Sequence, residues 1–393
     1  MKISNVYIGG WFQRTMLQLT EIYDFLRECK SQLNLDQEKL NEFHKRLEIG
    51  NIEYGVDGEE YILFTTALNI KVKIFEDGLI TVNNTNCSQE TLFTDISKVQ
   101  DYYENKLSPA FSYLFSLGAP VPKELAHIET IYPYFIVCEN GSRDEILKAL
   151  SIKDSQKYFE FNCKSYDVIR GDKYYFINNK EENLADIEKY IESQIFIREF
   201  KGQLHRYLNM HRIIWEKIDE VKEQAKVKGS EIVTFMTKLE GYSKTVNLID
   251  GRINQMSTYI STREKIAKSD SKLTEFLAIS GYRYETLRDT LSYIQYLWDM
   301  TQTYLNSAKT LFSSVKADVT DSSVNSLTVV ASMSAGASVL GLLTESAPTF
   351  DVWGLAYFLI LAAIGFVSTK VLEFFKNRKK YDVTDTEYDK NIN

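Results

Sequence analysis

The side chains best suited to bind a charged ligand lie between residues 194 and 212. Basic and amide residues recur there at steps of three or four positions, which places them on one face of a helix: Gln194, Arg198, Lys201, His205, Asn209 and Arg212. The basic members of this stripe can hold a phosphodiester by charge-assisted hydrogen bonds, and an adenine ring can stack on Tyr207 or Trp215. The same pattern fits a solvated helical face, because Glu216 and Asp219 follow on it and can pair with basic residues.

A second set of polar and small residues lies near the C-terminal end of the chain. Its members recur at steps of three or four and share one helical sector: Asp318, Asp321, Asn325, Thr328, Ser332 and Gly336. Within a bilayer this sector fits either a tightly packed interface between helices or the wall of a water-filled pore. The pore-lining residues would be Asn325, Thr328, Ser332 and Gly336, with Val329 and Met333 as apolar constrictions.

Two acidic residues follow this sector. Glu345 and Asp351 would attract cations at the outer mouth of such a pore, or they are simply solvated loop residues.

Enzymatic motifs are not found in the sequence. The four histidines form no HExxH pattern, and there is no GxSxG, P-loop or CxxC sequence. The four cysteines fit a reducing compartment as ordinary buried thiols. We therefore expect no enzymatic activity, no catalytic residue and no required cofactor, and the sequence leaves any metal ligands unassigned.

The composition limits the classes of protein that remain. The 393 residues are enough for two or three domains. The net charge of -8 and the pI near 5.3 argue against a protein that binds nucleic acid directly, which would need a basic surface. The many aromatic residues and the few prolines exclude a disordered chain.

Two long runs without charge lie in the last quarter of the chain. Residues 324–343 are long enough to span a bilayer, and residues 353–372 form the second run, with a short external loop at 344–352. A basic cluster from Lys370 to Lys380 favours a cytoplasmic C-terminus, and two spans then place the N-terminus inside as well. We expect a multi-pass protein of the inner (plasma) membrane with a C-terminal two-helix transmembrane hairpin. The alternative is a buried hairpin in a soluble core.

The remaining residues divide by their periodicity. Residues 1–182 mix β-rich runs with helical stretches, which predicts a cytoplasmic α/β domain. Residues 183–272 predict a cytoplasmic helical region, residues 273–323 a stalk helix, and residues 373–393 a basic, then acidic, cytoplasmic tail. From Leu287 to Val319 apolar or small residues recur in strict alternation of four and three, and a repeat of 3.5 residues is typical of helices that pack side by side. No Pro or Gly interrupts residues 282–335, so one helix can run into the first span.

This layout resembles the CorA family of divalent-cation channels. The family carries Gly-Met-Asn at the end of its first span, whereas this chain reads Gly341-Leu342-Leu343-Thr344, so only the glycine matches. The opening YIGGWF and the aromatic-rich N-terminal domain resemble the CorA-like effectors associated with type III CRISPR systems. That resemblance implies a homopentameric ion channel for antiviral defence. It also implies opening by a cytosolic nucleotide second messenger, a conjugate of S-adenosylmethionine with AMP.

Two other functions remain open on the sequence alone. The first is a CorA-type divalent cation (magnesium) transporter with a divergent loop, and the second is a membrane-tethered scaffold. The expected partners are further copies of the chain, the lipid bilayer and a small nucleotide, with divalent cations as possible ligands.

Overall fold

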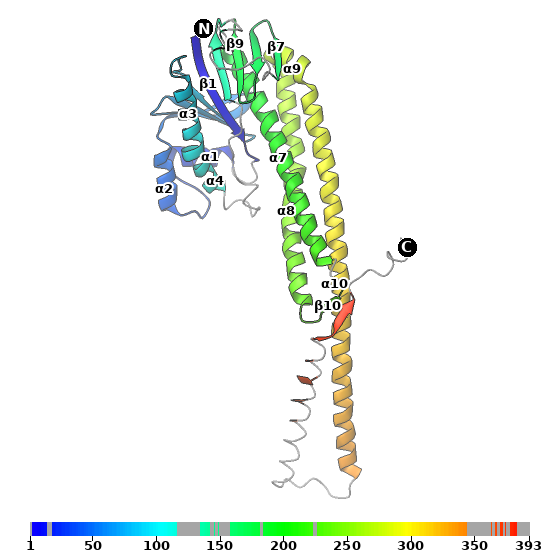
Figure 1. The fold of residues 1–393 in the computed structure, drawn as a ribbon. Helices are drawn as coiled ribbons and strands as arrows, with labels where there is room; N and C mark the ends of the chain where they lie inside the picture. Colours follow the sequence, from blue (N-terminus) through cyan, green and yellow to red (C-terminus); the bar gives the residue numbers. More distant parts are fainter. Residues whose placement is uncertain are drawn as a thin grey trace. The chain divides into compact units, whose positions relative to one another are not determined.

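A computed structural model describes residues 2–13, 18–115, 134–141, 158–180, 184–222, 226–343 and 378–382, with a few single positions near 145 and from 363 to 374. The chain divides into two compact units (Figure 1). The first comprises Met1–Asn209 and Leu248–Tyr296, and the second comprises Met210–Asn247 and Leu297–Asn393.

The first unit contains a sheet of nine strands. Their spatial order is β2-β3-β4-β5-β1-β6-β9-β8-β7, and every neighbouring pair is antiparallel except β6 and β9. The strands are β1 (Lys2–Trp11), β2 (Ile49–Asp57), β3 (Glu59–Thr66), β4 (Ile70–Phe75), β5 (Leu79–Asn84), β6 (Tyr134–Glu139), β7 (Phe159–Asn162), β8 (Tyr166–Arg170) and β9 (Tyr174–Asn179).

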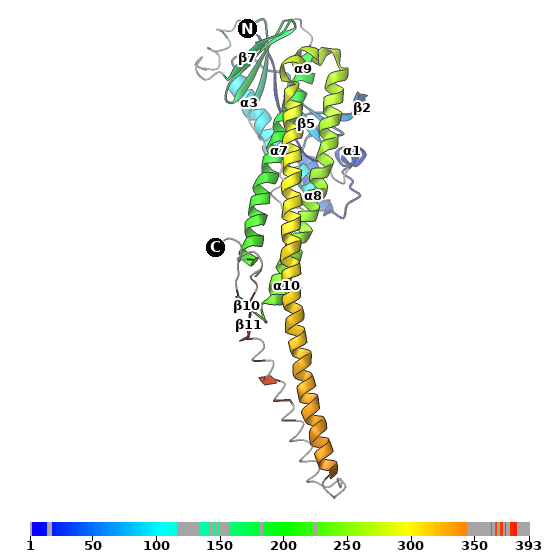
Figure 2. The same ribbon diagram turned by 90° about the vertical axis from the view of Figure 1, so that its right-hand side faces the viewer.

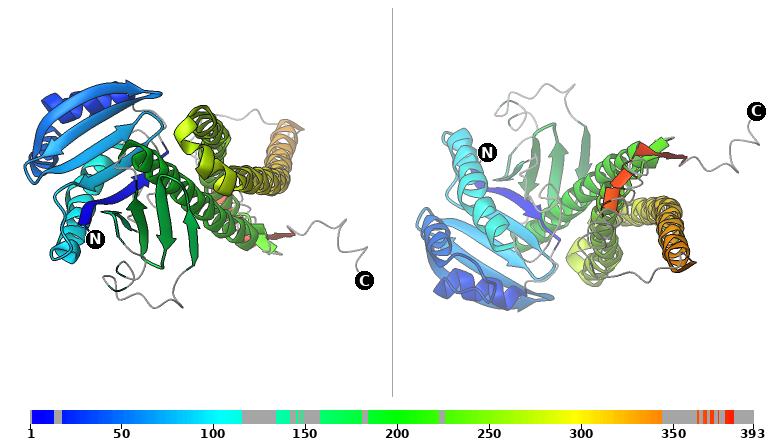
Figure 3. Two further views of the ribbon diagram at one scale, coloured as in Figure 1. Left: turned by 90° about the horizontal axis from the view of Figure 1, so that it is seen from above. Right: turned by 90° about the horizontal axis from the view of Figure 1, so that it is seen from below.

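Short helices cover one face of this sheet, and a long helix lies against the other (Figure 3). The short ones are α1 (Leu19–Glu28), α2 (Gln37–Arg46), α3 (Leu92–Asp101) and α4 (Ser108–Phe115), with a π-helical turn at Tyr102–Leu107. Strand alternation sends Val6 and Ile8 of β1 into the core formed with these helices. The residues between them, Tyr7 and Gly9, face α7 (Leu184–Lys222), where Tyr7 donates to Glu188.

Three long helices and one short helix complete the described chain. They are α7, α8 (Ile232–Ser269), α9 (Thr274–Ser280) and α10 (Tyr282–Leu343), and α10 runs without interruption for 62 residues (Figure 2). A two-stranded sheet in the second unit pairs β10 (Lys226–Lys228) with β11 (Lys380–Asp382).

The repeat of 3.5 residues in α10 is confirmed as a buried seam. Its members are each at most 5% exposed: Leu287, Leu291, Ile294, Trp298, Thr301, Leu305, Ala308, Phe312 and Val315. Helical periodicity puts them on one side of α10, where they bury apolar area within their own unit.

The predicted transmembrane hairpin is wrong for the part of the chain that the structure describes. No helix formed by the described residues is both long enough and apolar enough to cross a membrane. Residues 324–343 do belong to α10, but several described side chains there carry hydroxyl groups: Thr328, Ser332, Ser334 and Ser338. The prediction treated absence of charge as hydrophobicity, whereas moving a hydroxyl into hydrocarbon is unfavourable.

The other parts of that prediction fall largely beyond the described chain. Residues 344–352 lie outside it, and of residues 353–372 the structure describes only 363, 366, 367, 370 and 371.

Candidate ligand-binding cavity

A cavity of about 290 Å³ in the first unit gathers basic and aromatic side chains. Strands β8 and β9, helix α7 and the first turns of α10 supply its lining, which consists of Arg170, Tyr175, Gln194, Ile197, Arg198, Lys201, Tyr282, Arg283, Thr286 and Leu287. This lining contains four basic residues and no carboxylate. A volume of this size is near the lower end for sites that take small organic ligands.

Gln194 holds two walls of the cavity together. Its side-chain oxygen accepts from the hydroxyl of Tyr175 at 3.3 Å and from Nη1 of Arg283 at 2.9 Å. Gln194 is only 4% exposed, so these hydrogen bonds are protected from water. The ring of Tyr175 is also stacked on Phe135, with centroids 4.9 Å apart. The side chains of β9 and α10 therefore meet on one residue of α7.

Arg170 carries a buried donor that faces no acceptor among the described residues. Its Nε atom is shielded from solvent and makes no hydrogen bond to them. The guanidinium lies 5.3 Å from the ring centroid of Tyr175 and 6.0 Å from that of Tyr158, so aromatic faces support the charge. Because buried N–H groups normally have a partner, this atom is suited to an acceptor on a ligand.

Arg283 stays cationic despite its burial. Burial disfavours its charged form, but interactions with the hydroxyls of Tyr282 and Tyr175 outweigh that effect and raise the pKa of the guanidinium. Its guanidinium also lies 5.9 Å from the ring centroid of Phe159. The side chain thus brings a fixed positive charge to the α10 wall of the cavity.

The other two basic residues differ from one another. Arg198 donates from Nε to Glu199 at 2.9 Å and from Nη2 to the carbonyl of Gly9 at 2.9 Å, so its charge is balanced within the protein. Lys201 is exposed and has no ion-pair partner in the described chain. Arg170, Arg283 and Lys201 therefore surround the cavity without a carboxylate from the described residues, which makes it electropositive.

The four ligand residues proposed from the sequence separate in the structure. Arg198 and Lys201 line the cavity, and Gln194 lies beside them. His205 is exposed on α7 and is not part of the lining. Arg212 belongs to the second unit, where its side chain is 74% exposed and lies 3.9 Å from Glu216.

The two aromatic residues suggested for stacking are already occupied. Tyr207 is fully buried, and its hydroxyl lies 2.6 Å from the side-chain oxygen of Gln13. Trp215 is stacked on Tyr304 in the second unit, with centroids 4.5 Å apart. The sequence analysis missed Arg170 and Arg283, because they come from different elements and no local spacing connects them.

The proposed pore residues are described only in part. Thr328 and Ser332 are exposed on α10, and their hydroxyls donate to the backbone carbonyls of Val324 and Thr328 at 2.9 and 2.7 Å. The remaining members lie outside the described side chains or residues: Asn325, Val329, Met333, Gly336, Glu345 and Asp351.

Comparison with known proteins finds two structural neighbours. No family model and no curated protein sequence matches the chain. A CorA magnesium transporter from Methanocaldococcus jannaschii is 10% identical, with 63% of this chain and 90% of that chain covered and a TM-score of 0.27. The full-length CmaX protein is 12% identical, with 61% and 88% covered and a TM-score of 0.23.

The first neighbour is of the family that the layout of the sequence resembles, and neither neighbour supports the CRISPR-associated branch. Likeness at this level carries no weight for activity, so function is inferred below from the residues of this chain.

Proposed function

We propose that this protein is a CorA-like channel or transporter whose activity responds to an anionic nucleotide bound in the cavity of the first unit. The observation that carries the proposal is the cavity lining, in which Arg170, Arg283 and Lys201 lack carboxylate partners and the buried Nε of Arg170 lacks an acceptor. The ligand implied by the CRISPR-associated resemblance, a conjugate of S-adenosylmethionine with AMP, belongs to this class. A homopentamer acting in antiviral defence is the corresponding biological proposal.

The lining suits both parts of a nucleotide. A phosphate oxygen can accept from the guanidinium groups of Arg170 and Arg283, and such charge-assisted bonds are about twice as strong as neutral ones. The base can stack on Tyr282, which is 62% exposed at the cavity wall. Lys201, exposed on α7, adds a charge that attracts the ligand from solution.

A ligand in this position also suggests how activity can respond. It would contact β8, β9, α7 and the first turns of α10 at once, so any change in their spacing changes its affinity. A ligand shifts a conformational equilibrium by its difference in affinity for the two states. The continuous helix α10 begins at this wall with Tyr282 and Arg283.

Calorimetric titration of the full chain with AMP, ATP and a dinucleotide tests the site. We expect Arg283→Gln to weaken binding about 10- to 100-fold, because a hydrogen bond to a charged group contributes about 1.5–3 kcal/mol. Arg288→Gln is the matched control, since Arg288 lies on the same helix, outside the lining, and pairs with Glu264. Equal affinities for the two variants would remove the cavity from the proposal.

Ion flux tests the response itself. The chain is reconstituted in liposomes, and flux is measured with and without the nucleotide that binds most tightly. Flux that depends on the nucleotide supports the proposal. Magnesium flux that ignores every nucleotide indicates a CorA-type transporter, and absence of flux under all ligands indicates a scaffold.

A further inference from the structure

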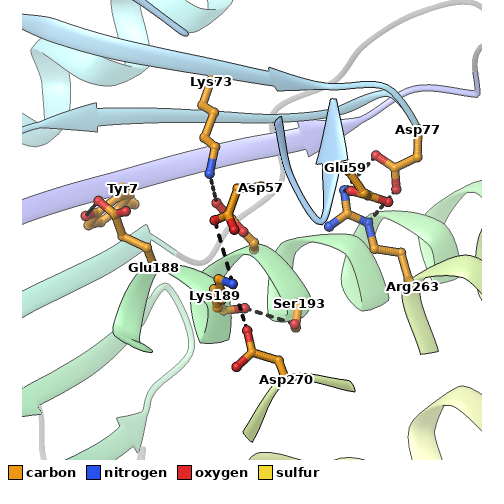
Figure 4. A network of polar contacts seen from close by, with 11 residues as sticks. Tyr7, Asp57, Glu59, Lys73, Asp77, Glu188, Lys189, Ser193, Arg263 and Asp270 are labelled. Carbon is orange, nitrogen blue, oxygen red and sulfur yellow. Dashed lines mark hydrogen bonds and ion pairs between the residues drawn. The ribbon is translucent and has the colours of Figure 1, made fainter. Parts of the chain in front are cut away.

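A buried network of charged side chains joins helix α8 to the sheet and to helix α7 in the first unit (Figure 4). Arg263 of α8 donates from Nε and Nη2 to both carboxylate oxygens of Asp77, at 2.5 and 2.7 Å. Its Nη2 also lies 2.8 Å from Oε2 of Glu59. Asp77 lies in the turn between β4 and β5, and Glu59 begins β3, so one guanidinium ties α8 to two parts of the sheet.

Helix α7 supplies the other half of the network. Glu192 lies 3.1 Å from Nζ of Lys73 on β4. Lys189 lies 2.7 Å from Asp270 and 3.7 Å from Asp57. These residues surround a cavity of about 30 Å³, which is large enough for a water molecule.

The network holds more acidic than basic groups. The carboxylates are Asp57, Glu59, Asp77, Glu192 and Asp270, and the cations are Lys73, Lys189 and Arg263. The side chains of Glu59 and Asp77 are only 9% and 5% exposed, so water screens this imbalance weakly. Buried carboxylates in excess of their cations favour uptake of a proton.

We propose that Glu59 is the proton-binding site of this network and that its protonation tightens the hold of Arg263 on the sheet. This inference concerns the sheet and α8, and it stands independently of the proposed function. Asp77 already gives Arg263 two hydrogen bonds, which makes Glu59 the carboxylate that the guanidinium needs least. When Glu59 is neutral, Arg263 keeps its bidentate pair while the repulsion between Glu59 and Asp77 disappears.

Charged groups face Glu59 from every element packed against it. They are Arg263 and Lys265 of α8, Asp77 and Glu76 of the β4–β5 turn, Lys73 of β4, Glu192 and Lys189 of α7, and Asp57 of β2. Burial is the largest influence on Glu59, and with its acidic neighbours it outweighs the attraction of Arg263 and raises the pKa of the carboxyl to about 7.

Protons have access to Glu59 from solvent. It also lines a larger cavity of about 530 Å³ with Gly58, Thr262 and Lys265, which are exposed. The carboxyl group can therefore titrate while the unit remains folded.

The direction of the effect follows from linkage. A carboxyl whose pKa is about 7 in the closed network and near 4.5 when the network opens binds its proton more tightly in the closed form. The closed contact is therefore favoured at low pH and weakens as the pH rises through 7. Between pH 6 and pH 8 the ratio of open to closed forms should increase about tenfold.

Hydrogen exchange measured on the full chain tests this inference. After correction for the intrinsic pH dependence of exchange, protection of the α8 amides around Arg263 should fall about tenfold from pH 6 to pH 8 in the native chain. Glu59→Gln, which resembles the protonated form, should show the same protection at both pH values. Glu53→Gln removes an exposed carboxylate of β2 and should behave like the native chain.

Two results would overturn the inference. One is a native chain whose protection of α8 does not change with pH, and the other is a Glu59→Gln chain that still loses protection about tenfold. If Glu59→Gln does not fold, Glu59→Asp keeps a carboxyl group at this position and must keep the pH dependence. A flat profile for that variant also contradicts the proposal.

Discussion

Arg198 and Lys201 line the same cavity but have different tasks. Arg198 donates to Glu199, which is 1% exposed, and to the carbonyl of Gly9 on β1, so it joins α7 to the sheet. Lys201 is exposed and has no ion-pair partner among the described residues. At the scale of single residues, one cation stabilises the fold and the other is available to a ligand.

Substitution by glutamine should separate these tasks. Arg198→Gln leaves Glu199 buried without its cation, so we expect a loss of about 3–5 kcal/mol in the free energy of unfolding. Lys201→Gln should change that free energy by less than about 0.5 kcal/mol but weaken nucleotide binding. Urea denaturation measures the first quantity and calorimetry the second. Two variants of equal stability would show that the pair of Arg198 with Glu199 is not structural.

The elements of the sheet depend on two turns with left-handed glycines. Gly58, between β2 and β3, has φ of +75°, and Gly78, between β4 and β5, has φ of +91°. A Cβ atom on Gly58 would have nothing within 4 Å, whereas one on Gly78 would lie 2.0 Å from the carbonyl oxygen of Phe12. Both turns favour glycine for its backbone, and only the second also excludes a side chain by contact.

Alanine substitutions at these turns therefore make a matched pair. Gly58→Ala should destabilise the first unit by about 1–2 kcal/mol, the penalty for a left-handed residue with a Cβ atom. Gly78→Ala adds a backbone clash and should lose about 3 kcal/mol or more. Thermal unfolding of the two variants compares them directly. Equal losses would mean that the chain near Phe12 moves away without penalty.

The two units of the whole molecule should respond to pH in opposite directions. In the first unit, burial raises the pKa of Glu59 to about 7, so its contribution to stability is complete below pH 4.5 and is lost as the pH rises. In the second unit, burial lowers the pKa of His211, whose ring centroid lies 5.9 Å from that of Trp298. A histidine with a lowered pKa stabilises the fold at high pH and loses that contribution as the pH falls below 6.5.

Hydrogen exchange resolved by unit can detect this contrast. Between pH 5 and pH 7 we expect protection around His211 to increase while protection around Arg263 decreases. His211→Gln should abolish the first trend and leave the second unchanged. Parallel trends in both units would contradict the assignment of these two groups.

Local patterns in the sequence determined much of the secondary structure. The β-rich run at 61–75 forms β3 and β4, and the alternation of four and three from Leu287 onward is the buried seam of α10. Alternation and helical periodicity are properties of neighbouring residues, so they can be read before folding. By contrast, Trp11 to Leu33 seemed helical, but β1 extends to Trp11 and only Leu19–Glu28 is α1, because sheet pairing overrides local preference.

The membrane prediction failed for a different physical reason. Charge can be counted along a sequence, but a span also requires a continuously apolar surface, and the hydroxyls of residues such as Thr328 and Ser332 reduce it. Absence of charge was therefore an insufficient criterion.

The candidate cavity and the proton site depended on tertiary structure. The stripe on α7 identified Arg198 and Lys201, but Arg170 and Arg283 reach the same cavity from β8 and α10. Likewise, Arg263 meets Asp77 and Glu59 only when α8 packs on the sheet. The sequence by itself determined which segments form helices or strands and which helix faces are apolar. Only the folded chain decided which distant charges lie within a few ångströms of each other, because burial and electrostatic interaction depend on distance in space.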